Sequence, residues 1–183
     1  IFVIMNFVGT IYGTMWALFG EDTFGWNGRM IGLSLGAYGI FHAGAQAFLT
    51  GPAVARLGER WALIVGMACE LTALVAMGVI TQGWIVFLLA PLFALGGIGM
   101  PALQSLTTTQ VSADKQGQLQ GVLASLVSLA AIFGPLFFSF AYFGIRGVWP
   151  GLIWIIGAGI YLLALPLMLG VRRRVPPTAA AGE

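Results

Sequence analysis

The chain has 183 residues, of which 59% are hydrophobic and only 8% are charged. A soluble domain carries about 25% charged residues, so this composition excludes the soluble class and indicates an integral membrane protein in a lipid bilayer. The net charge of +2 is small, and no basic stripe suits a nucleic-acid partner, so we expect none.

Long apolar runs follow one another along the chain. A helix crosses a bilayer in about 20 residues, whereas barrel strands are about 10 residues long and alternate in polarity. The sequence therefore predicts an all-α membrane protein, with a six-helix bundle over residues 1–170 and a disordered cytoplasmic tail over 171–183. The spans are expected at about 1–19, 28–50, 61–80, 84–106, 117–143 and 148–170. Because the first run starts at Ile1 with no methionine, we expect the chain to be part of a longer protein.

The positive residues predict the orientation of the bundle, because cytoplasmic connections of membrane proteins collect Lys and Arg. If the first span starts in the cytoplasm, the outer connections hold only Arg29 and Arg146. Both ends of the fragment are then cytoplasmic. The cytoplasmic side holds Arg56, Arg60, Lys115, Arg172, Arg173 and Arg174.

Three glycine pairs have the G-x-x-x-G spacing, which places two small residues on one helix face and lets another backbone approach closely. The pattern indicates a tight helix bundle. The pairs are Gly9 with Gly13, Gly32 with Gly36, and Gly117 with Gly121.

The second span carries a polar stripe. Ser34, Tyr38, His42 and Gln46 are spaced four residues apart and therefore follow one side of a helix. A polar face is unfavourable in lipid, so the stripe should face the bundle interior or a water-filled cavity. His42 is the only histidine in the chain. It is either a hydrogen-bonded packing residue or, since its charge changes near neutral pH, a residue that couples protons to transport.

Residues 32–36 of the same span match G-x-S-x-G, the nucleophile elbow of serine hydrolases. That motif needs a sharp turn from strand to helix, whereas Ser34 lies inside a helical span. His42 is eight residues on, roughly 12 Å along the helix axis, and so cannot activate Ser34. We therefore expect no enzymatic activity.

Glu70 lies in the middle of the third apolar run. A charge at the bilayer centre costs about 2.5–3.5 kcal/mol on an insertion scale, so such residues usually mark ion or proton handling. A carboxyl hydrogen-bonded to a neighbouring helix for packing is the alternative, although Ser, Thr or Asn would serve that purpose better.

The connection between the second and third spans, Gly51–Arg60, compresses a glycine, two arginines and an acid into a short turn. It resembles the G-x-x-x-D-R-x-G-R-R loop motif of the major facilitator superfamily, which lies between the second and third helices of each six-helix half. The wider sequence resembles one family within it, the bacterial tetracycline/proton antiporters, over about residues 1–170. The stretches that carry this likeness are 16–22 (WALFGED), 39–48, 51–60, 96–104 (GGIGMPALQ), 116–121 (QGQLQG), 134–136 (GPL) and 154–157 (WIIG).

The resemblance implies that the chain is the C-terminal half, helices seven to twelve, of a twelve-helix transporter in the bacterial inner membrane. It implies export of tetracycline with a divalent cation such as Mg²⁺, in exchange for protons. The missing N-terminal half would be its partner. No permanently bound cofactor and no metal site of the protein's own are expected, because the metal would arrive with the drug.

The resemblance also assigns roles to single residues. Glu70 and His42 match the carboxylate and histidine implicated in proton coupling, with a glutamate where the family has an aspartate. Gln46, His42 and Glu70 would contact substrate, joined by Asn6 and Thr10, which stand where the family often has glutamines. The gating loop would comprise Gly51, Arg56, Gly58, Glu59 and Arg60.

Glycine and proline are expected to loosen two later spans, at Gly96–Gly99 with Pro101 and at Gly134 with Pro135. These positions are either hinges or simple packing kinks. Other functional interpretations remain open: a related drug/proton antiporter with a different amphipathic substrate, a scaffold that does not transport, and an intramembrane enzyme.

Overall fold

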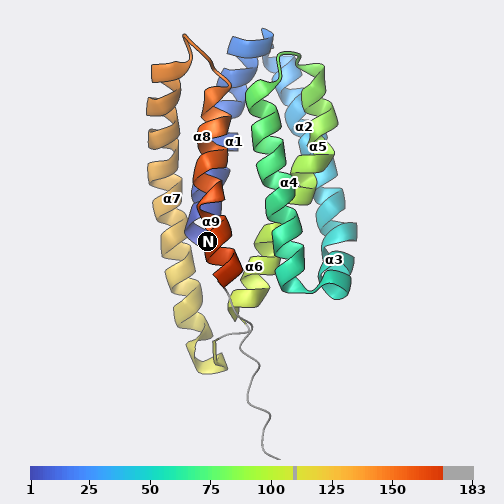
Figure 1. The fold of residues 1–183 in the computed structure, drawn as a ribbon, viewed down its shortest axis with the longest axis vertical. Helices are drawn as coiled ribbons and strands as arrows, with labels where there is room; N and C mark the ends of the chain where they lie inside the picture. Colours follow the sequence, from blue (N-terminus) through green and yellow to red (C-terminus); the bar gives the residue numbers. More distant parts are fainter. Residues whose placement is uncertain (109–110, 171–183) are drawn as a thin grey trace, which may run out of the picture.

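A computed structural model describes residues 1–108 and 111–170. Within these residues every long element is a helix, and six helical paths run alternately up and down the bundle (Figure 1). The predicted all-α fold with six helices is thus confirmed. The tail predicted at 171–183 lies outside the described residues.

The helices have the following bounds. The first path is α1 (Phe2–Phe24), and the second joins α2 (Gly28–Gly44), the π-helical turn η1 (Ala45–Leu49) and α3 (Thr50–Leu57). The third is α4 (Glu59–Val79), and the fourth joins α5 (Trp84–Gly96) and α6 (Gly99–Thr108). A 3₁₀ turn, η2 (Ala113–Lys115), leads into α7 (Gln116–Ile145), and the last path joins α8 (Leu152–Leu162) and α9 (Ala164–Gly170).

By length and composition, four described stretches are long and apolar enough to cross a membrane. They are Phe2–Phe24, Glu59–Val79, Trp84–Thr108 and Gln116–Ile145. The second and sixth expected spans are shorter as regular helices. The second changes to a π-helical turn at Ala45, and the sixth begins only after the turn that contains Pro150 and Gly151.

Two expected connections are largely helical. The first helix extends beyond residue 19, so Glu21 and Asp22 lie in its last turn, and it ends at Gly25 with φ 64°. In the Gly51–Arg60 connection, α3 continues to Leu57, and the chain turns only at Gly58, where φ is 76°. This left-handed φ is adopted readily by glycine, which lets two helices meet at a single residue.

The close helix contacts do not involve the G-x-x-x-G pairs. A Cβ atom added at any of those six glycines would meet no atom within 4 Å. At Gly66 of α4, by contrast, a Cβ would lie 2.6 Å from the Gly99 nitrogen and 2.9 Å from its Cα. The G-x-x-x-G spacing therefore does not identify the positions at which these helices touch.

The helix α7 is continuous through Pro135. Gly134 lies against Thr10 of α1, where a Cβ would come within 2.9 Å of the threonine Cβ and Cγ2. This glycine serves close packing between α1 and α7.

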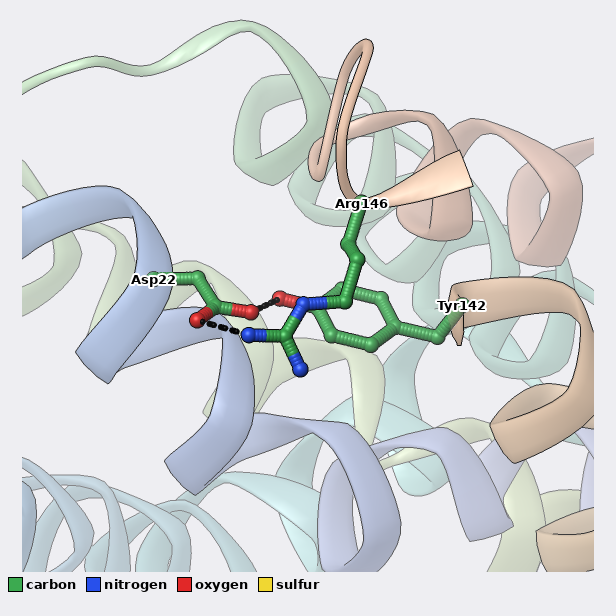
Figure 2. Close-up of polar contacts among 3 residues, drawn as sticks. All are labelled: Asp22, Tyr142 and Arg146. Carbon is green, nitrogen blue, oxygen red and sulfur yellow. Dashed lines mark hydrogen bonds and ion pairs between the residues drawn. The ribbon is translucent and has the colours of Figure 1, made fainter. Parts of the chain in front are cut away.

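At one end of the bundle a polar cluster joins the last turns of α1 and α7 (Figure 2). The hydroxyl of the buried Tyr142 donates to Asp22 Oδ2 at 2.7 Å, and Arg146 Nη2 lies 2.8 Å from Asp22 Oδ1. The Arg146 guanidinium is also 5.4 Å from the centre of the Phe143 ring. Asp22 thus accepts the hydrogen bond of a buried hydroxyl that water cannot reach.

We expect Asp22→Leu to destabilise the full-length protein by about 2 kcal/mol, because it leaves the Tyr142 hydroxyl buried without its acceptor. Arg146→Gln should cost less than about 1 kcal/mol, because the arginine side chain is 38% exposed and water replaces its partner. Thermal unfolding of the purified protein in detergent measures both. Equal losses in the two variants would show that the ion pair, not the buried hydroxyl, dominates this cluster.

Candidate functional site

The candidate site is built around the break between α5 and α6. Gly97 and Ile98 leave the helix there, and Pro101 lies four residues after Gly97. In a regular helix the nitrogen of residue 101 would donate to the Gly97 carbonyl, but proline has no N–H. Gln46 Nε2 of η1 donates to this carbonyl instead, at 3.0 Å. A side chain from the second helical path thus supplies the hydrogen bond that the proline removes.

The helix α4 packs on the other side of the break. Gly66 lies against the Gly99 backbone, as described above, and Glu70 lies one helical turn further along α4. A Cβ added at Gly96 would lie 3.1 Å from Glu70 Cβ and 3.2 Å from Glu70 Cα. The absence of side chains at Gly66 and Gly96 therefore brings Glu70 against the break.

His42 meets the break from α2. A Cβ added at the neighbouring Gly97 would lie 2.8 Å from His42 Nδ1, so the imidazole fills the space above this glycine. The Tyr38 hydroxyl lies 3.4 Å from the same nitrogen. Glu70 and His42 therefore rest on two consecutive glycines, one approaching from α4 and the other from α2.

The polar stripe of α2 lies on the inner side of the helix. Ser34 is 2% exposed, and Tyr38, His42 and Gln46 are half-buried, whereas Leu33 and Ile40 on the same helix are 53% and 75% exposed. Ser34 accepts a hydrogen bond from Trp16 Nε1 at 2.9 Å and donates to the Ile31 carbonyl at 2.8 Å. Ser34 is thus a buried packing residue inside a helix and not an exposed nucleophile.

The first helix contributes a residue, Tyr12, that the sequence pattern did not indicate. The Tyr12 hydroxyl donates to Glu70 Oε1 at 2.6 Å. Its ring packs against Phe93 and Trp154, with centroid distances of 5.4 and 5.7 Å. A tyrosine in an apolar span was the available signal, because a buried phenol usually finds a hydrogen-bond partner.

Asn6 and Thr10, the other predicted substrate residues, contact different helices. Asn6 Nδ2 donates to the Phe2 carbonyl at 2.9 Å and lies 3.9 Å from Met100 Sδ, so it borders the start of α6. Thr10 instead donates to the Phe7 carbonyl at 2.7 Å and packs against Gly134 of α7. The structure brings Glu70, His42, Gln46 and Asn6 to the break but places Thr10 one turn further along α1, against Gly134 of α7.

The predicted gating residues lie at the opposite end of the bundle from Asp22. Gly51, Arg56, Gly58 and Arg60 are exposed, while Glu59 is half-buried and accepts a hydrogen bond from Ser105 of α6. The start of α4 is therefore connected to the fourth helical path beyond its break.

The donor set at the break contains one carboxylate, one imidazole and one amide, contributed by Glu70, His42 and Gln46. Among the described residues no group of three or more His, Cys, Asp or Glu side chains could hold a metal ion. The arrangement can bind and release a proton and can attract a cation, and its polar groups come from separate helices.

Comparison with known proteins shows what the whole chain is similar to. Residues 1–183 match the family model described as Major Facilitator Superfamily. The chain is 50% identical over 168 residues to the tetracycline resistance protein, class C, of Escherichia coli, which covers 92% of this chain and 42% of that protein. It is 48% identical to the class G protein of Vibrio anguillarum, with coverages of 92% and 43%, and 39% identical to the class B protein of Escherichia coli, with coverages of 88% and 40%. The chain thus spans less than half the length of these relatives. No solved structure matches it significantly.

Proposed function

Because the chain belongs to the major facilitator superfamily, a family of membrane transporters and not of enzymes, we propose that it is the C-terminal half of a proton-coupled antiporter that exports tetracycline from bacteria and confers resistance. The relatives that are 45–50% identical are tetracycline resistance proteins, which supports this substrate. The N-terminal half of the same transporter would be the partner of this bundle.

One observation carries the proposal: Glu70 and His42 are held on consecutive glycines at a helix break. Helix breaks in transporters commonly form binding sites near the middle of the membrane. An ionisable residue in such a place is expensive, and it is retained where protons or ions move. A carboxyl and an imidazole at one helix break suit a transporter that exchanges a proton for a cation.

The exchange of proton for drug would result from their competition for the charge of Glu70. A proton neutralises the carboxylate, whereas a cationic complex of drug and metal favours its ionised form. Because each ligand disfavours the other, binding of drug releases the proton and binding of a proton releases drug. His42 would relay the proton or contact the drug, and Gln46 and Asn6 would border the same cavity.

The divalent cation would be cargo and not a resident cofactor. Magnesium sites usually involve carboxylates together with water and substrate oxygens. The break offers a single carboxylate, so a magnesium ion there would depend on ligands supplied by the drug. The transported species would accordingly be a tetracycline complex with Mg²⁺ or a similar ion.

The bundle would lie in the inner membrane, with both ends of the chain on the cytoplasmic side. This orientation would place the turn at Gly58, with Arg56 and Arg60, on the cytoplasmic side, and the distribution of Lys and Arg supports it. In a transporter whose halves rock against one another, this short turn would hold two helix ends together during gating.

Everted membrane vesicles that contain the full-length transporter test the proposal. We expect tetracycline uptake that requires both a proton gradient, acidic inside, and Mg²⁺. Uptake that persists without the gradient would contradict proton coupling. Vesicles that contain folded protein but take up no tetracycline would refute this substrate and favour a drug/proton antiporter for another amphipathic compound.

A further inference from the structure

We propose that Tyr12 is a positioning residue for Glu70, whose carboxylate it holds in the ionised state that receives the cationic drug. The inference rests on the proposed function, because it concerns the same exchange of proton and drug. It assigns a role to a side chain that donates a hydrogen bond directly to the intramembrane carboxylate.

The phenol is fixed in place by aromatic neighbours. The Tyr12 ring packs edge-on against Phe93 at 5.4 Å, with an interplanar angle of 82°, and lies 5.7 Å from Trp154 and 6.4 Å from Trp16. Trp154 and Phe93 are almost fully buried. Because these rings restrict the side chain, the hydroxyl can serve as a preorganised donor toward α4.

The carboxylate is restricted from the opposite side. Glu70 Cα and Cβ pack against Gly96, and Glu70 Oε2 is the oxygen nearest to that glycine. Glu70 Oε1 accepts the Tyr12 hydrogen bond at 2.6 Å. One oxygen is thus held by α1, while the other faces Gly96 at the helix break, where we place the drug and metal.

The hydrogen bond depends on the protonation state of Glu70. A hydrogen bond from a hydroxyl to a carboxylate is roughly twice as strong as a hydrogen bond between neutral groups. Protonation of Glu70 therefore weakens the link between α1 and α4, and deprotonation restores it. Tyr12 in this way connects the proton on Glu70 to the contact between two helices.

Other titratable groups near Glu70 lie on α2, on α8 and on α4 itself. Tyr38 of α2, Tyr161 of α8 and Cys69 of α4 interact electrostatically with the carboxyl, and His42 of α2 lies beyond Gly97. Tyr12 differs from them by its 2.6 Å hydrogen bond. Removal of its oxygen atom should therefore alter proton exchange more than the equivalent change at Tyr38 or Tyr161.

The test is proton-driven tetracycline exchange by the full-length protein in liposomes, measured across a range of pH. Because a bond donated to the carboxylate favours its ionised form, Tyr12→Phe should move the pH profile of exchange to higher pH by about one unit. Tyr142→Phe is the matched control. It removes the same atom from a buried phenol that also donates to a carboxylate, that of Asp22, and it should leave the profile unchanged.

A second variant keeps the shape of the side chain, in case Tyr12→Phe disturbs folding. Incorporation of 3-fluorotyrosine at position 12 makes the phenol a stronger donor, and the profile should then move to lower pH. Shifts of opposite sign in the two proteins would support the proposal. An unchanged profile in both, with normal exchange by the wild type, would overturn it. Absence of exchange in the folded wild type would overturn the proposed function instead.

Discussion

Glu70→Gln in the full-length antiporter is expected to abolish proton-coupled exchange and to leave insertion and folding intact. Glutamine has nearly the same shape, so it can pack on Gly96 and accept the Tyr12 hydrogen bond. Glutamine cannot ionise, however, so the site lacks the negative charge for which the proton and the cationic drug complex compete. Tetracycline uptake by everted vesicles, normalised to the amount of folded protein, measures the effect.

Glu21→Gln supplies the matched control for this prediction. Glu21 is an exposed carboxylate on α1, away from the break, and its replacement should leave uptake unchanged. Glu70→Asp keeps the charge but shortens the side chain by one methylene, so uptake should fall without disappearing. Exchange that survives in Glu70→Gln would refute the role of Glu70.

Gly66→Ala is expected to destabilise the protein and to impair exchange together. The new Cβ would lie 2.6 Å from the Gly99 nitrogen, 2.9 Å from Gly99 Cα and 3.2 Å from the Gly96 carbonyl oxygen. These are all backbone atoms, so α4 must move away from the break and carry Glu70 with it. Overpacking of this kind costs about 1–3 kcal/mol. The midpoint of thermal unfolding in detergent measures this loss of stability.

Gly159→Ala on α8 separates packing from helix propensity. Alanine favours a helix over glycine by about 1 kcal/mol at both positions, but a Cβ at Gly159 would meet no atom within 4 Å. The midpoint of Gly159→Ala should therefore equal or exceed that of the wild type. If Gly66→Ala were equally stable, the close contact between α4 and the break would not exist in the protein.

The sequence predicted the elements that depend on local composition. Apolar runs of about 20 residues predict helices, and the inward orientation of the second path follows from the spacing of Ser34, Tyr38, His42 and Gln46. Glu70 stands out because the energetic cost of a charge in the membrane does not depend on the fold. For these features, hydrophobicity and helical periodicity are sufficient.

The features that depend on long-range contacts could not be predicted in this way. The loss of the Gly97 hydrogen bond follows from Pro101, but nothing local indicates that Gln46, 51 residues earlier, replaces it. The pairing of Tyr12 with Glu70 likewise requires knowledge of which helices are neighbours. Thr10 and Asn6 are four residues apart, yet one lies against α7 and the other beside α6.

The helical ends were also difficult to predict, because turn signals and helix signals coincide. The Gly51–Arg60 connection contains glycine, proline and charged residues typical of loops, but within it only Gly58 has a positive φ. Pro135 suggested a disturbed helix, although α7 continues through it. The neighbouring Gly134 packs closely against Thr10 of α1.

Proton release upon drug binding is the most direct measurement of whether the drug complex and the proton compete for Glu70. Purified full-length protein in weakly buffered detergent solution would be mixed with tetracycline and Mg²⁺ while the pH is recorded. We expect the wild type to release protons upon binding and Glu70→Gln to release none. Equal proton release by both proteins, after subtraction of the release from drug and metal without protein, would contradict competition at Glu70.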